Sequence, residues 1–165
     1  MFTVEKHLET IKSNLEQQSA VLVNNLREVV GYTFAADVEL LDFSAFIEHG
    51  NHELSIMFFS MDRDANEVFQ EPGKSGFAGS TSVLEEMTYY HVAKEHMGAF
   101  DDFYEAHDEI LFEQEQHVFG EWFSTCWQEA GGDSVKLPAY FGVHDETEAL
   151  DLKQRHWVDA EEKWD

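Results

Sequence analysis

The chain is poor in cysteine, proline and positive charge. One cysteine and two prolines occur among 165 residues, and ten Lys and Arg stand against 34 Asp and Glu, for a formal net charge of −24. A lone cysteine excludes an internal disulfide, so nothing favours a secreted scaffold held by disulfides. The shortage of Lys and Arg argues against nucleic acid or an anionic membrane as a direct partner, because phosphate binding requires clustered positive charge.

Long apolar segments and targeting signals are also lacking. The apolar runs are far shorter than the roughly 20 residues that cross a bilayer. Residues 1–7 contain no basic flank followed by an apolar core, so we expect no signal peptide and a cytoplasmic location. Hydrophobic residues reach 43% and aromatic residues 14%, which predicts a single globular domain over residues 1–165.

Apolar residues near the start of the chain recur at helical spacing. They occupy Val4, Leu8, Ile11, Leu15, Leu22, Leu26 and Val29. This stripe predicts a long helix over about residues 3–30, interrupted near Gln18 and Ser19 and ended by Gly31. Two uses of the stripe remain open, namely packing on a sheet within the chain or forming a homodimer through the N-terminal helix.

Residues 41–58 change to the two-residue period of strands. Gly50-Asn51 is typical of a tight turn, which predicts a β-hairpin. In this hairpin residue 47 faces 54, 45 faces 56 and 43 faces 58. A loop is predicted from Met61 to about Thr81.

The second half of the chain predicts helices followed by short strands. Residues 82–85 match a capping box and predict a helix to about Met97 that stops at Gly98. Residues 102–105 repeat the signal and predict a helix to Ala130, with Gly120 as a candidate break. Strands are predicted near 139–143, 150–152 and 156–158. The order predicts an α+β fold, with an antiparallel β-sheet packed against a long N-terminal helix and two or three further helices.

No complete catalytic motif is present. The G-x-S-x-G nucleophile elbow is absent, and Cys126 lies on an apolar helical stripe between Trp122 and Trp127, which predicts a buried, inert thiol. We therefore assign no catalytic residue and no cofactor, and we favour a binding protein over an enzyme.

Nine histidines provide candidate metal ligands. His49 and His52 are predicted to face each other across the hairpin, but without a third ligand. On the predicted helices the H-E-x-x-H pattern is absent, so a divalent-metal site requires two helices to meet. The residues at suitable four-residue spacing are His91, Glu95, Glu113 and His117.

The acidic excess is concentrated in residues 81–133, where thirteen Asp and Glu accompany one Lys. Part of this block recurs every three or four residues, which predicts an anionic helix face opposite an aromatic one. The residues of this face are Asp101, Asp102, Glu105, Asp108, Glu109 and Glu113. A dense field of one sign favours an oppositely charged partner.

These observations leave three functions open. The first is a non-enzymatic acidic binding protein of bacterial type that neutralises a basic protein partner, as an immunity protein or inhibitor does for a toxin or nuclease. The second is a metal-dependent hydrolase that uses the helix-borne His and Glu residues. The third is an acidic halotolerant domain with a structural or interaction role, since salt-adapted surfaces are rich in carboxylates and poor in Lys.

Overall fold

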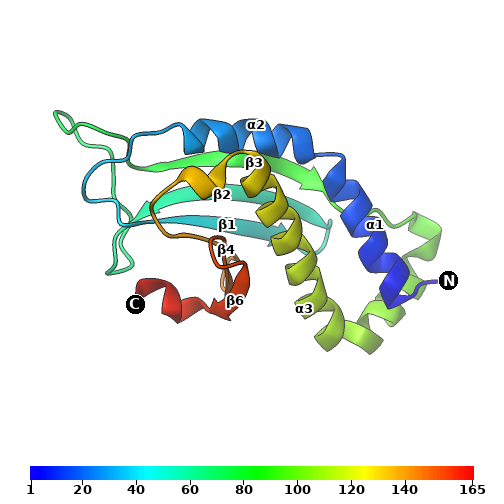
Figure 1. Ribbon diagram of the computed structural model, residues 1–165. Helices are drawn as coiled ribbons and strands as arrows, with labels where there is room; N and C mark the ends of the chain where they lie inside the picture. The colour runs from blue at the N-terminus through cyan, green and yellow to red at the C-terminus, as the bar shows by residue number, and fades with distance from the viewer.

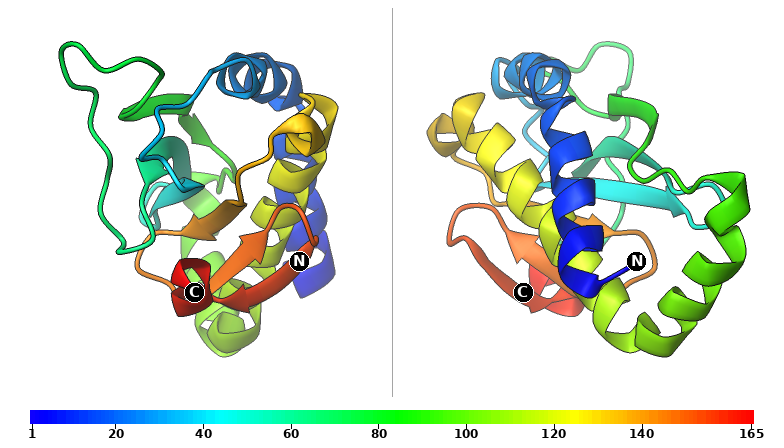
Figure 2. Two further views of the ribbon diagram at one scale, coloured as in Figure 1. Left: turned by 60° about the vertical axis from the view of Figure 1, so that its left-hand side comes forward. Right: turned by 90° about the vertical axis from the view of Figure 1, so that its right-hand side faces the viewer.

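The computed structural model describes residues 1–165 and contains a six-stranded sheet with three α-helices (Figure 1). The α-helices are α1 (Val4–Glu16), α2 (Ser19–Val30) and α3 (Met97–Glu129), and the 3-10 helices are η1 (Lys94–His96), η2 (Gly132–Ser134) and η3 (Ala160–Trp164). The strands are β1 (Leu40–Glu48), β2 (Glu53–Met61), β3 (Ser80–Thr88), β4 (Ala139–Val143), β5 (Glu148–Asp151) and β6 (His156–Asp159). Figure 2 shows that the three α-helices lie on the same side of the sheet. The α+β class is therefore confirmed.

The N-terminal apolar stripe forms two helices that pack within the chain. α1 and α2 are separated at Gln17 and Gln18, close to the predicted interruption, and Gly31 caps α2. Stripe residues such as Ile11 and Leu22 are fully buried in the core shared with the sheet and α3. Packing on the sheet, the first of the two predicted uses, therefore accounts for this stripe.

The β1–β2 hairpin has the predicted antiparallel register. Ile47 pairs with Leu54 and Ala45 pairs with Ile56, and every second residue of β2 is buried. The apolar face of this hairpin supplies the centre of the core. The two-residue repeat of apolar residues was sufficient to predict which face of each strand is buried. A slip of one residue in the strand pairing would expose all of these apolar residues.

The helix predicted over residues 82–97 is wrong, because residues 80–88 form β3 and pair with β2. Ser82 and Glu85 match the local capping pattern, but the sheet satisfies backbone groups through long-range pairing instead. Irregularities in the β2–β3 register allow the adjacent residues Val83 and Leu84 both to be buried. This bulged pairing conceals the two-residue period that would identify a strand.

The longest helix is α3, in the second half of the chain rather than at its N-terminus. It begins at Met97, with Gly98 inside its first turn, and is kinked at His107, where φ is −127° and ψ is 15°. The ring Nδ1 of His107 donates to the carbonyl of Phe103 at 2.9 Å, so a side chain enters the backbone hydrogen-bond ladder. Gly131, with a φ of 93°, follows the end of the helix, as predicted.

Gly120 does not break α3 but allows a close contact with the sheet. A Cβ at this position would lie 2.4 Å from Cζ2 of Trp157 in β6. The absent side chain therefore lets the helix backbone approach the indole ring.

The sheet is mixed and not wholly antiparallel. β4 pairs in parallel with β1, whereas the other four neighbouring pairs are antiparallel. The long α3 returns the chain to the opposite side of β1, and such a crossover permits parallel pairing. None of the helices combines the length and the apolar composition required to span a membrane.

Candidate functional site

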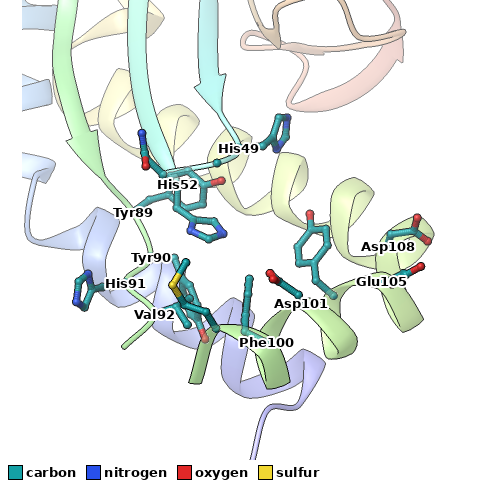
Figure 3. Close-up of a pocket in the computed structure, with 14 residues that line it drawn as sticks. His49, His52, Tyr89, Tyr90, His91, Val92, Phe100, Asp101, Glu105 and Asp108 are labelled. Carbon is teal, nitrogen blue, oxygen red and sulfur yellow. The ribbon is translucent and has the colours of Figure 1, made fainter. Parts of the chain in front are cut away.

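A cavity of about 590 Å³ opens where three segments meet. The β1–β2 turn, the residues that follow β3 and the first half of α3 form its walls (Figure 3). These segments are distant in the sequence and are brought together by the hairpin and by the crossing of α3. The cavity contains two kinds of wall, one aromatic and one acidic.

The aromatic wall consists mainly of residues after β3 and in the first turns of α3. Tyr89, Tyr90 and Phe100 are buried, and Tyr104 is half-buried. The rings of Tyr90 and Phe100 are nearly parallel, with centroids 5.4 Å apart and planes at 28°. This packing fixes the ring faces in place.

His52 projects into the cavity from the turn between β1 and β2 (Figure 3). The pairing of β1 with β2 ends at Glu48 and Glu53, so the turn has four residues and not the predicted two. His52 is the last residue of this turn and has a positive φ of 53°. Its ring centroid lies 5.3 Å from that of Phe100. Burial lowers the pKa of His52 below its ordinary value, so the ring is uncharged at neutral pH.

The other two histidines on the wall point elsewhere. Figure 3 shows His49 and His91 directed away from the space occupied by the His52 ring. The predicted opposition of His49 and His52 across a hairpin is therefore not realised as a pair of rings sharing one ion.

The acidic wall comes from α3. Asp101, Glu105 and Asp108 line the cavity, and their spacing places them on one side of the first half of the helix. All three are exposed, and none forms an ion pair within the chain. The remaining members of the predicted anionic face lie outside this cavity. Asp102 is exposed, and Glu109 and Glu113 line a separate hollow toward the second half of α3.

A buried polar network supports the pocket from behind. Nε2 of His7 lies 2.7 Å from one carboxylate oxygen of Glu115, and the hydroxyl of Tyr104 donates to the other oxygen at 2.7 Å. His7 and Glu115 are 1% and 3% exposed, so this network is shielded from water. Burial, followed by the hydrogen bond to Glu115, raises the pKa of Tyr104, and the phenol stays protonated.

The predicted metal ligands separate into two locations. His91 lies in the loop after β3 and Glu95 in η1, so the two do not share an α-helix. Glu113 and His117 do approach each other, and a residue that the sequence did not indicate, Glu148 of β5, joins them. The three ligand atoms lie within 4.8 Å of one another.

His117 is held in this second cluster by two contacts. Its Nε2 is 3.3 Å from a carboxylate oxygen of Glu148, and its ring stacks on Trp157 at 4.5 Å. The cluster is partly exposed, with side-chain exposures of 36% for His117 and 42% for Glu148.

Cys126 is buried, as predicted, and is 2% exposed. Burial raises the pKa of its thiol to about 11. The thiol therefore has little thiolate character at neutral pH.

The sequence pattern indicated Asp101, Glu105 and Asp108, which line the cavity, but it indicated neither the aromatic wall nor the buried network beneath it. The signal for His7 was its position on the apolar stripe, four residues before Ile11, where a polar residue requires a partner. No protein-family model, curated protein or solved structure matches this chain.

Proposed function

We propose that this chain is a non-enzymatic binding protein whose acidic surface engages a basic protein partner. The main support is a set of six exposed carboxylates on α3, none of which forms an ion pair with Lys, Arg or His of the same chain. This set, termed the α3 acidic surface, consists of Asp101, Asp102, Glu105, Asp108, Glu109 and Glu113.

The chain provides no nearby cation in sequence to relieve this charge. No Lys or Arg occurs between Lys94 and Lys136. Like charges three or four residues apart on a helix destabilise it by a few tenths of a kcal/mol per pair. A basic partner would remove this repulsion, and the field of the uncompensated carboxylates would accelerate its approach.

The form of this function that we favour is an immunity protein or inhibitor for a cationic nuclease or toxin. A nuclease requires a positively charged groove to hold phosphate groups. A helix that presents six carboxylates can occupy such a groove and exclude the nucleic acid. This mechanism requires binding without chemistry.

Capture of partner proteins by a tagged form of the chain tests the proposal. In one variant the six residues of the α3 acidic surface become Asn or Gln. The matched control removes six exposed carboxylates elsewhere, namely Glu5, Glu9, Glu16, Glu28, Glu85 and Glu161.

The expected result is a basic protein held by the wild type and by the control but not by the α3 variant. Its Kd should weaken about tenfold or more between about 50 mM and about 500 mM salt, because screening shortens the reach of exposed charges. Equal retention by both variants, or an affinity independent of salt, contradicts the proposal.

A second candidate, a metal-dependent hydrolase, is favoured by the approach of Glu148 to Glu113 and His117. Two carboxylates and one imidazole suit a divalent ion such as zinc, and three protein ligands leave a position for a water molecule. Elemental analysis and calorimetric zinc titration test it, with His117→Ala against the exposed His156→Ala as control. Binding that His117→Ala leaves unchanged excludes this cluster.

A further inference from the structure

We infer that the pocket at the start of α3 receives one arginine side chain of the basic partner. The inference rests on the proposed function and adds to it the residue that the partner inserts and the place that it occupies. The α3 acidic surface would attract the partner over a distance, whereas the pocket would hold one side chain as an anchor. Interfaces commonly concentrate their binding energy in such an anchor.

The aromatic wall suits a planar cation. Tyr90 and Phe100 are nearly parallel to each other, and His52 packs edge-on against both, at centroid distances of 5.6 Å and 5.3 Å. The faces of aromatic rings attract cations, and a guanidinium group also stacks on them. Tyr90 and Phe100 are only 7% and 5% exposed, so they form the fixed floor of the pocket. The half-buried rings of His52 and Tyr104 offer the more accessible aromatic surface to a guest.

Tyr104 adds an electron-rich ring on the α3 side of the pocket. Its hydroxyl donates to the buried carboxylate of Glu115, whose other oxygen is held by His7. A phenol that donates to an anion gains electron density, which strengthens the attraction of its ring for a cation. The buried network therefore holds the Tyr104 ring in its place beside the pocket.

The acidic wall supplies the hydrogen-bond acceptors. Asp101, Glu105 and Asp108 border the same cavity as the aromatic rings, and Figure 3 shows Asp101 beside Phe100. A guanidinium group can thus place its face on a ring and direct its N–H groups to a carboxylate. The ring of His52, whose pKa is lowered by burial, is uncharged at neutral pH and does not repel this cation.

Arginine fits this combination better than lysine. Its planar group has five donors in a fixed arrangement and pairs with carboxylates in a bidentate manner, whereas an ammonium group is a compact and strongly hydrated charge. The volume of about 590 Å³ accommodates the side chain together with part of the partner's adjoining backbone.

Three short peptides provide the probes for the test. They are blocked at both ends and have the sequence Gly-Ser-X-Ser-Gly, where X is arginine, lysine or the uncharged arginine analogue citrulline. Binding is followed by NMR through the ring signals of His52, with His156, which is exposed on β6, as a remote reference. We expect the arginine peptide to bind with a Kd of about 1 mM and the citrulline peptide to bind about tenfold more weakly. The lysine peptide should lie between them.

Paired charge variants locate the site. Asp101→Asn combined with Glu105→Gln should weaken the arginine peptide about fivefold or more. The control, Glu121→Gln with Glu129→Gln, removes the same charge from exposed positions elsewhere on α3 and should change the Kd less than about twofold. All four positions are exposed, so the fold should survive either pair of substitutions.

Equal binding of the arginine and citrulline peptides overturns the inference, as does a His52 signal that does not move at about 10 mM peptide. If these results accompany salt-sensitive capture of a basic protein, the pocket assignment fails and the proposed function stands. If the arginine peptide binds in the pocket while no captured protein depends on the six carboxylates, the pocket is supported and the proposed function is overturned.

Discussion

Nε2 of His7, in the first helix, lies 2.7 Å from Oε2 of Glu115, 108 residues later in the chain, and both side chains are almost fully buried. The contact joins α1 to the second half of α3 directly behind the pocket. Because Tyr104 uses the other oxygen of the same carboxylate, the network connects the packing of the N-terminal helix to the wall of the cavity.

Removing one partner of this pair should destabilise the protein strongly. We expect His7→Leu and Glu115→Leu each to lower the free energy of unfolding by about 3 kcal/mol, because each leaves a buried polar group without its partner. The double variant should lose clearly less than the sum of the two. Urea unfolding measures all three values, and strictly additive losses would show that the two groups do not depend on each other.

His52 should make stability depend on pH in the mildly acidic range. Its pKa in the folded protein is lowered by burial from an ordinary value of 6.5, so the unfolded chain binds a proton more readily. The free energy of unfolding should therefore decrease as the pH falls below 6.5. His52→Asn, which tolerates the positive φ, should reduce this decrease. Urea unfolding of the wild type and of His52→Asn at pH values on both sides of 6.5 provides the measurement. If stability depends on pH identically in the two proteins, the prediction is wrong.

The thiol of Cys126 should resist modification in the folded protein. It is 2% exposed, and burial raises its pKa to about 11. A chromogenic disulfide reagent at mildly alkaline pH should label it slowly in the native state and fully in guanidinium chloride. Because it is the only cysteine, the signal is unambiguous. Rapid stoichiometric labelling of the native protein would show an accessible thiol instead.

Two glycines of α3 should respond oppositely to alanine. At Gly120 the new Cβ would lie 2.4 Å from Trp157, and we expect a loss of about 1–3 kcal/mol from overpacking. At Gly98 nothing lies within 4 Å of the same atom, and we expect a gain of about 0.5 kcal/mol, because alanine restricts the unfolded chain. Thermal unfolding compares the two variants, and a similar effect at both positions would argue against the contact with Trp157.

Elements with a regular period could be predicted from the sequence, whereas elements formed by distant pairing could not. The alternation around Ala45 and Ile56 was enough to predict the hairpin register. In β3 the adjacent burial of Val83 and Leu84 disrupts that alternation, and a local capping pattern predicted a helix instead. The parallel pairing of β4 with β1 depends on where α3 returns the chain, which no local pattern indicates.

The candidate site shows the same contrast between features of local sequence pattern and features formed by distant segments. The carboxylates were predictable because they recur on one helix, although the kink at His107 could not be read from their spacing. The pocket combines His52, Tyr90 and Phe100 from three separate segments, so its existence depends on tertiary structure. Likewise, the partnership of His7 with Glu115 requires α1 to lie against α3.

The assembly of the pocket from three distant segments has a thermodynamic consequence. The unfolded chain cannot form the site, so any compound that occupies it must shift the folding equilibrium toward the native state by mass action. At a concentration of about 100 times its Kd, an occupant adds about 2.7 kcal/mol to the free energy of unfolding. The melting temperature of this protein is therefore a direct assay for the chemistry of its ligand, even before a partner is identified.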